Sequence, residues 1–141
     1  MLILTVMLAM AAHDPVPPAA MSGPPAPETV QYAESRPPMI GLEGPELDAC
    51  GGVGRIGGFP DGITLLEAPE EGARKGEELP HRTLVWLCEA QGAWQGVVYA
   101  SGDFQELGDC RVSSPVAEPE PYDGPCKYGW LKARQIQLLV G

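Results

Sequence analysis

The chain has 141 residues and a net charge of -10 from 19 acidic and nine basic side chains. This length accommodates one domain. A protein this acidic repels phosphate groups, which argues against binding to nucleic acids or to anionic membrane surfaces.

The first eleven residues are almost wholly apolar and carry no charged side chain. A bilayer-spanning helix needs about 20 apolar residues, so this run is too short to span a membrane. It fits the hydrophobic region of a secretory signal, with an A-x-A-like cleavage site at residues 9–11. No Lys or Arg precedes the run, and the alternative is a buried N-terminal strand or helix. We predict a signal peptide at residues 1–11, a periplasmic or secreted protein, and no stable membrane insertion after cleavage.

Residues 12–46 are rich in Pro, Ala, Glu, Ser and Gly. Prolines at this density are incompatible with a helix or a central strand. The segment is therefore predicted to be a disordered, extended and partly polyproline tether. A proline-rich tract can also be a ligand for an aromatic groove, but we favour the interpretation as a spacer.

Short apolar runs between Gly and Pro corners fill residues 47–141. A strand is expected at residues 63–66. Residues 83–88 alternate between two faces and are followed by a polar-glycine corner and a second apolar run, which predicts a hairpin. Near the C-terminus, two short strands flank residues 133–135, which have the length of one 3₁₀ turn. Because no segment shows a sustained helical period, we predict an all-β fold, a compact antiparallel barrel.

Four cysteines lie far apart in the sequence, at Cys50, Cys88, Cys110 and Cys126. They include no C-x-x-C pair, so their spacing does not fit a zinc site. An even number of cysteines behind a signal-like start predicts two disulfide bonds. Three pairings are possible. We favour Cys50–Cys88, which would tie the start of the domain to a central strand, and Cys110–Cys126, which would close a long loop.

Several short motifs follow one another in this domain. A strand ending in proline lies at residues 65–69, and a K-G-x-x-L turn lies at residues 75–79. A V-x-L…G-x-W-x-x-V hairpin covers residues 85–97, and G-W-L lies at residues 129–131. In this order the motifs resemble those of bacterial SH3-like domains. The resemblance implies a small antiparallel barrel at residues 47–141, in a non-catalytic adaptor that binds peptide or peptidoglycan.

Residues 100–127 depart from that family, in which a tight turn occupies this position. A loop of this length inside a compact domain is usually either functional or disordered. Because it contains two of the cysteines, we predict an ordered insertion that a disulfide bond closes.

The candidate ligand-binding residues are aromatic: Trp86, Trp94, Tyr99, Tyr122 and Trp130. Trp94 and Trp130 occupy the positions that the resemblance makes characteristic, and for both we favour a role in covering the barrel core. Tyr99 and Tyr122 are the better candidates for an exposed groove, because Tyr99 ends a strand and Tyr122 lies among prolines.

Three basic residues, Lys127, Lys132 and Arg134, make the C-terminal end locally basic. They would suit a peptide that bears a carboxylate, although a solvated edge strand explains them equally well.

No arrangement in the sequence predicts catalysis. His81 is interpreted as a surface histidine in a turn, and the aspartates of the insertion do not have the spacing of a calcium loop. We therefore expect no catalytic residue, metal or cofactor. The function expected is binding of peptide or peptidoglycan in the bacterial cell envelope. The alternative is a structural subunit of an envelope complex that uses the insertion or the barrel edge as its interface. The oligomeric state is left open.

Overall fold

The computed structural model describes residues 31–58 and 60–141. The predicted signal peptide at residues 1–11 and the predicted linker up to residue 30 lie outside the described residues. In the described part, every regular element is a β-strand or a short 3₁₀ helix, so the predicted all-β class is confirmed. None of the described helices is long and apolar enough to cross a membrane.

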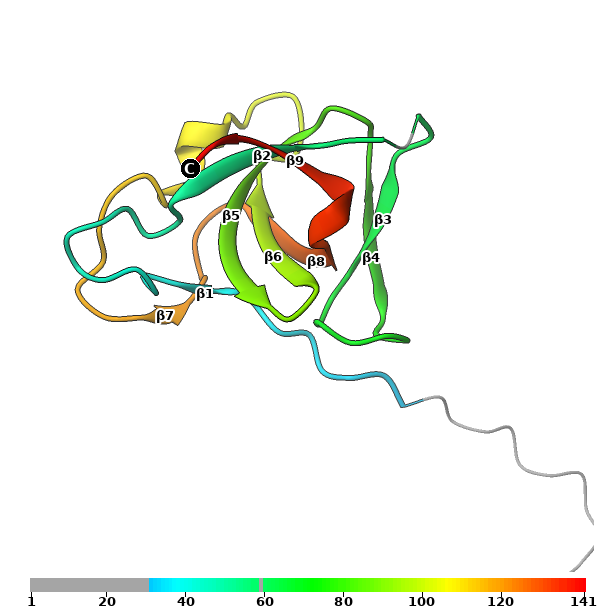
Figure 1. Cartoon of the computed structure of the whole chain (residues 1–141), viewed down its shortest axis with the longest axis horizontal. Helices are drawn as coiled ribbons and strands as arrows, with labels where there is room; N and C mark the ends of the chain where they lie inside the picture. Colours follow the sequence, from blue (N-terminus) through cyan, green and yellow to red (C-terminus); the bar gives the residue numbers. More distant parts are fainter. Residues whose placement is uncertain (1–30, 59) are drawn as a thin grey trace, which may run out of the picture. The chain divides into compact units, whose positions relative to one another are not determined.

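Nine strands and two 3₁₀ helices follow one another along the described chain (Figure 1). The strands are β1 (Met39–Ile40), β2 (Gly52–Ile56), β3 (Ile63–Leu66), β4 (Lys75–Leu79), β5 (Leu84–Gln91), β6 (Trp94–Tyr99), β7 (Glu120–Pro121), β8 (Lys127–Lys132) and β9 (Ile136–Val140). The 3₁₀ helices are η1 (Leu107–Cys110) and η2 (Ala133–Gln135). Strand β3 and the series β8, η2 and β9 lie where the sequence predicted them.

Seven strands form one sheet in the order β4-β3-β8-β6-β5-β2-β9, and β1 pairs separately with β7. Figure 1 shows β5, β6 and β8 as a curved central layer, with the β3–β4 hairpin beside it. Among the described residues, no strand pairs with the outer side of β4 or β9, so the pairings do not close the sheet into a barrel. The SH3-like barrel therefore stays a prediction.

Strands β5 and β6 form the hairpin that the sequence predicted. Their connection is the two residues Gly92 and Ala93, since Gln91 pairs directly with Trp94. Gly92 has a φ of 57°, a left-handed conformation that glycine adopts without the steric cost of a Cβ atom. The polar-glycine corner of the sequence is therefore a tight turn.

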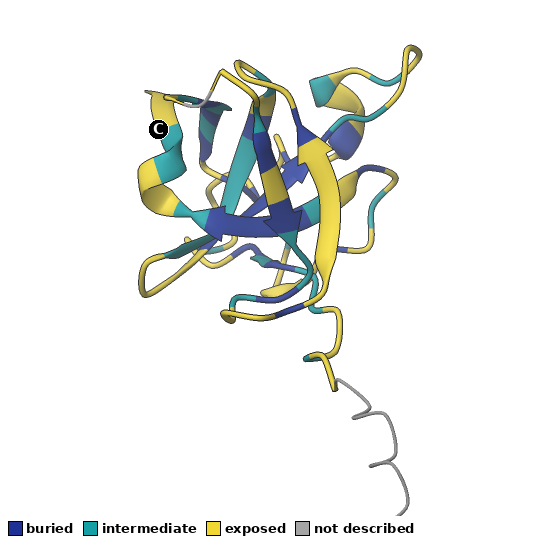
Figure 2. Cartoon of the chain, turned by 90° about the vertical axis from the view of Figure 1, so that its right-hand side faces the viewer, coloured by how far each residue is buried: buried dark blue, intermediate teal, exposed yellow. Residues whose placement is uncertain are grey.

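Both faces of the central strands are buried. Neighbouring residues of a strand point to opposite faces, and Val97 and Val98 of β6 accordingly belong to two different hydrophobic clusters. The sheet cluster is made of Ile56, Ile63, Leu65, Leu79, Val85, Val97, Tyr99 and Leu131. The insertion cluster is made of Ile40, Ala49, Cys50, Val98, Cys110, Val112, Tyr122 and Cys126. Figure 2 shows buried residues along the central strands and exposed residues mainly in the loops and on an outer strand.

Both favoured disulfide bonds are present. Cys50 and Cys88 are joined with a Cα–Cα distance of 4.5 Å, and Cys110 and Cys126 with one of 5.1 Å. No cysteine of the described chain is free. Two disulfide bonds fit a protein that resides in an oxidising compartment, as secreted proteins do.

The insertion at residues 100–127 is ordered, as predicted. It contains η1 and β7, and its buried Val112 and Tyr122 give it a small core of its own. Its backbone is also bonded to the early part of the domain, because Cys50 N donates to Val112 O and Ala49 N donates to Ser114 O, each over 3.0 Å. The insertion also packs against the sheet, because Val112 and Tyr122 share a hydrophobic cluster with Val98 of β6, and Trp86 of β5 packs against that cluster.

The folded part begins earlier than the expected residue 47. Pro38 is fully buried, Ile40 is 4 % exposed, and β1 lies within the segment that the sequence assigned to the linker. The physical reason is that the insertion offers this segment a pairing partner: Met39 lies opposite Pro121, and Tyr122 N donates to Pro38 O over 2.9 Å. Figure 1 shows β1 and β7 side by side.

Candidate functional site

The register of β6 and β8 places Trp94 directly opposite Lys132. Side chains directly opposite each other in an antiparallel pair lie on the same face and are close enough to interact. Lys132 Nζ lies 3.9 Å from the centre of the Trp94 ring, a cation–π contact. The same ammonium group is 2.7 Å from Glu71 Oε1. Trp94 and Lys132 therefore form one unit at the end of the β5–β6 hairpin.

A groove of about 300 Å³ opens beside this unit. We call it the Trp94 groove. Its apolar lining includes Leu66 of β3 and Trp94 of β6, and its polar lining includes Lys75 of β4, Lys132 of β8 and Arg134 of η2. The side chains come from strands that are distant in sequence but adjacent in the sheet.

The Trp94 groove is locally basic in an acidic protein. Three of the nine basic residues of the chain line it, Lys75, Lys132 and Arg134, together with one carboxylate, that of Glu71. Within the described chain, neither Lys75 nor Arg134 has a carboxylate within ion-pair distance. The Glu71 side chain is 79 % exposed, so it can leave Lys132 without disturbing the core. The arrangement can accept a negative group next to an aromatic ring.

The three predicted tryptophans have different surroundings. Trp94 is half-buried at the groove. Trp130 also borders it but is fully buried, and its Nε1 donates to Arg36 O over 2.7 Å. Trp86 packs against the insertion cluster, and its Nε1 donates to Leu107 O over 2.8 Å. Of these rings, only that of Trp94 is both partly exposed and at the Trp94 groove.

Tyr99 is not exposed, contrary to the expectation. Its exposed fraction is 2 %, and its hydroxyl donates to Glu77 Oε2 over 3.0 Å. Burial, together with the hydrogen bond to Glu77 and its negative charge, raises the pKa of Tyr99 well above its usual range. The Tyr99 side chain points into the core, because β8 and the hairpin β3–β4 cover it. That covering comes from segments remote in sequence.

Tyr122 is also buried, which corrects the second expectation of an exposed aromatic. It is 4 % exposed; its hydroxyl donates to Cys110 O and accepts from Cys126 N, each over 3.0 Å. Burial raises the pKa of Tyr122, and the carboxylate of Asp123 adds to the rise. The hydroxyl links the two ends of the disulfide-closed segment, so Tyr122 is a structural residue of the insertion.

Lys127 lies apart from the other two predicted basic residues, at the opposite end of β8. Its Nζ is 3.3 Å from Glu77 Oε2, the carboxylate oxygen that also accepts from Tyr99. These side chains border a second cavity of about 360 Å³, together with Ser35 and Tyr128. The predicted basic cluster is therefore divided between two sites, and Lys75, which was not predicted, joins Lys132 and Arg134.

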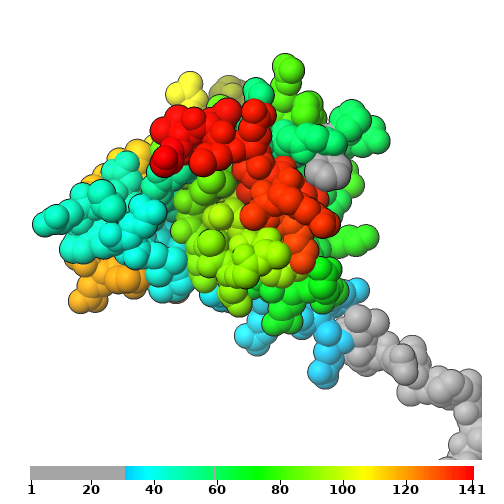
Figure 3. All heavy atoms as spheres, in the orientation of Figure 1, coloured from blue at the N-terminus to red at the C-terminus, as the bar shows by residue number. Residues whose placement is uncertain are grey.

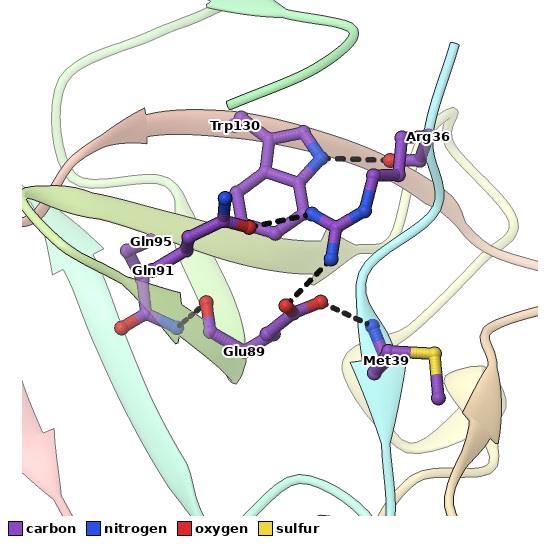
Figure 4. A network of polar contacts seen from close by, with 6 residues as sticks. All are labelled: Arg36, Met39, Glu89, Gln91, Gln95 and Trp130. Carbon is purple, nitrogen blue, oxygen red and sulfur yellow. Dashed lines mark hydrogen bonds and ion pairs between the residues drawn. The ribbon is translucent and has the colours of Figure 1, made fainter. Parts of the chain in front are cut away.

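A network around Arg36 was missed by the sequence analysis (Figure 4). Arg36 Nη2 donates to Glu89 Oε2 over 2.7 Å, and Arg36 Nη1 donates to Gln91 Oε1 over 3.0 Å. Met39 N donates to Glu89 Oε1 over 2.9 Å, and the Arg36 guanidinium carbon lies 4.9 Å from the centre of the Trp130 ring. A single arginine inside a proline-rich segment gave no signal for these partners.

His81 lies exposed in a turn, as the sequence predicted. Within residues 31–58 and 60–141, no group of three or more His, Cys, Asp or Glu side chains is placed to hold a metal ion. The basic residues at the Trp94 groove are two lysines and an arginine next to the partly exposed ring of Trp94, and together they are suited to holding an anion.

Comparisons with protein-family models, with curated proteins and with solved structures give no match to this chain.

Proposed function

We propose that the protein is a non-catalytic binding domain of the bacterial cell envelope that holds a carboxylate-bearing peptide in the Trp94 groove. The observation that carries the proposal is the gathering of Lys75, Lys132 and Arg134 around the half-buried ring of Trp94, in a chain with a net charge of -10. The two disulfide bonds and the signal-like start support an exported protein. The motifs that resemble bacterial SH3-like domains favour a peptide, such as that of peptidoglycan, as the ligand.

The binding step is an exchange of partners at Lys132. In the free protein the ammonium group is paired with the exposed Glu71 carboxylate. In the complex, a peptide carboxylate takes the place of the Glu71 carboxylate at Lys132 and also binds Arg134. An apolar part of the peptide contacts the Trp94 ring. Exposed ion pairs contribute little to stability, so releasing Glu71 costs little. Charge-assisted hydrogen bonds to the incoming carboxylate offset that loss.

The test uses intact sacculi in a pull-down, and acetyl-Ala-Ala with a free carboxylate in a titration followed by tryptophan fluorescence. We expect enrichment on sacculi and saturable binding of the peptide. Lys132→Ala should weaken both by about tenfold or more, since a hydrogen bond to a charged group contributes about 1.5–3 kcal/mol and 1.4 kcal/mol is tenfold. The matched control is Lys127→Ala, which changes the net charge equally at the other end of β8.

The C-terminal amide of the same peptide is the control on the ligand side, because it lacks the negative charge. Equal binding of the amide and the acid would contradict carboxylate recognition. Binding that Lys127→Ala weakens as much as Lys132→Ala would place the ligand outside the Trp94 groove. If neither sacculi nor the peptide binds, the proposal fails.

A second function is favoured by the edge strand β9. Leu138 is 60 % exposed, Leu139 43 % and Val140 68 %, and the strand ends the sheet (Figure 3, red). An apolar edge with unpaired backbone groups is a template for adding a strand from another protein. The protein would then be a structural subunit of an envelope complex. Co-purification from the native host distinguishes this function: Leu138→Lys should release the partner, whereas Lys132→Ala should not.

A further inference from the structure

The segment at residues 35–39, which we call the strap, crosses the sheet over Trp130. Its backbone is bonded on both sides, because Arg36 N donates to Glu67 O over 2.8 Å and Arg36 O accepts from Trp130 Nε1. Its side chains reach further along β5, where Arg36 binds Glu89 and Gln91. The strap thus contacts β5, β8 and Glu67, the residue that follows β3.

The sheet surface under the strap is shaped for a proline. Pro38 is fully buried, and a Cβ atom on Gly96 would lie 2.6 Å from Pro38 Cβ and 3.0 Å from the Trp130 ring. A side chain at position 96 would therefore exclude the strap. Because glycine has no side chain, the sheet surface at position 96 is open next to the indole of Trp130, and a proline ring fits onto it.

The same surface also carries a buried carboxylate that needs a cation as its partner. Glu89 is the buried charged residue of the described chain, 8 % exposed, and both oxygens of its carboxylate accept hydrogen bonds from the strap. A buried carboxylate without a partner is strongly unfavourable, so this position requires a positive group. Gln91 Oε1 accepts a second N–H of the same guanidinium, which selects the forked shape of arginine over a lysine.

An aromatic surface next to a carboxylate is a way in which proteins bind extended proline-rich segments that carry an arginine. We propose that Glu89, Gln91, Gly96 and Trp130 form a recognition site for an Arg-Pro-Pro segment, which the strap fills as an intramolecular ligand. When the strap is withdrawn, the site binds the same chemistry from another chain. The site shares only Trp130 with the Trp94 groove and is independent of the function proposed for that groove.

The strap acts as a competitor because it belongs to the same chain. A ligand held by a short flexible connection has an effective concentration on the order of millimolar. An external Arg-Pro-Pro segment therefore binds the intact protein weakly, and much better once Arg36 and Pro38 no longer hold the strap in place. The site becomes available to an external segment when the strap leaves it.

The test uses a fluorescein-labelled peptide with the sequence of residues 33–41, Ala-Glu-Ser-Arg-Pro-Pro-Met-Ile-Gly, and fluorescence anisotropy. The protein is the full chain with both disulfide bonds, either unchanged or with Arg36→Ala and Pro38→Ala. We expect saturable binding to the double variant, and binding to the unchanged chain that is weaker by about tenfold or more.

Two matched changes test the chemistry. In the double variant, Glu89→Gln should weaken peptide binding by at least about tenfold, since it removes one partner of a buried charge pair. The control is Glu78→Gln, which changes the net charge equally on the exposed strand β4 and should leave binding unchanged. A peptide in which Arg36 is replaced by alanine should lose binding to the same extent as Glu89→Gln.

A folded double variant that gives no saturable binding at about 1 mM peptide, a concentration that corresponds to about -4.1 kcal/mol, overturns the proposal. Equal effects of Glu89→Gln and Glu78→Gln overturn it as well. If the double variant does not fold, the proposal is tested with a second protein, in which a protease site is inserted after the exposed Pro45. That chain folds with its strap in place and is then cut. Exchange of the cut strap for labelled peptide supports the proposal, whereas unfolding on loss of the strap, or no exchange, overturns it.

Discussion

Gly96 determines how closely the strap approaches the sheet. The residue lies in the middle of β6, opposite Trp130, where most strands would carry a side chain. Here the space for a Cβ atom is taken by Pro38 and by the indole. A strand interior gains nothing from glycine by itself, so the residue is explained by this close approach.

Gly96→Ala should destabilise the protein by about 1–3 kcal/mol, the usual cost of forcing extra atoms into a packed site. The matched control is Gly108→Ala, because a Cβ atom at Gly108 meets no heavy atom within 4 Å. That variant should stay within about 0.5 kcal/mol of the unchanged chain. Urea unfolding followed by tryptophan fluorescence measures both. Equal midpoints for the two variants would show that the strap does not press on Gly96.

At the scale of elements, the insertion and the early part of the domain stabilise each other. Neither β1 nor β7 exceeds two residues, and each is the partner of the other. Their pairing holds because the Cys110–Cys126 bond closes the insertion and the Cys50–Cys88 bond fixes the early segment to β5. We expect these two-residue strands to depend on the covalent links for part of their stability.

Replacing Cys110 and Cys126 by alanine should cost about 3 kcal/mol, and replacing Cys50 and Cys88 about 4 kcal/mol, since the chain entropy released grows with loop length. The sequence separations are 16 and 38 residues. Thermal unfolding of the two double variants under non-reducing conditions measures the difference. Hydrogen exchange should locate the first loss of protection in the insertion for the Cys110 and Cys126 variant. An order of stabilities opposite to this one would contradict the loop-entropy explanation.

The elements that the sequence predicted are those with local causes. The hairpin of β5 and β6 follows from alternation and from a glycine in its turn, and both signals lie within residues 84–99. For the disulfide bonds, three pairings were possible from the sequence, and the favoured one, with Cys110–Cys126 closing the long loop and Cys50–Cys88 tying the start of the domain to a central strand, is the one observed. The strap could not be predicted, since Arg36 meets Glu89 across 53 positions and Trp130 across 94.

The candidate sites show the same division. Trp94 and Lys132 were both singled out from the sequence, but their contact depends on the register between β6 and β8. That register could not be derived from the sequence, because the 28 residues of the insertion at 100–127 separate the two strands. Tyr99 and Tyr122 were expected to be exposed because Tyr99 ends a strand and Tyr122 lies among prolines. They are buried because remote segments cover them, and a pattern of neighbours contains no information about such covering.

At the scale of the whole molecule, stability depends on pH through the buried tyrosines. The raised pKa of Tyr99 means that the folded protein keeps this proton at a pH at which the unfolded chain loses it. The unfolded state then binds fewer protons, so the free energy of unfolding falls as the pH increases. The stabilising contribution is complete below about pH 10, the ordinary pKa of tyrosine, and is lost above it.

We therefore expect the free energy of unfolding to decrease above pH 10 by about 1.4 kcal/mol per pH unit for this tyrosine. Tyr99→Phe removes the titrating group, so its decrease should be shallower by that amount, although the variant also loses the hydrogen bond to Glu77. Urea unfolding at several pH values between neutral and strongly alkaline measures both slopes. Parallel slopes for the two proteins would contradict the assignment.

The two edges of the large sheet differ in a way that limits how the molecule can associate. Strand β4 carries Lys75, Glu77 and Glu78, whereas the last three residues of β9 are apolar. Charged side chains on an edge oppose the docking of another strand. Continuous growth by strand addition needs two adhesive edges on the same sheet, and the large sheet, as the described residues form it, offers only the β9 edge. We therefore expect any self-association through β9 to end at a pair related by a two-fold axis and not to grow into fibrils.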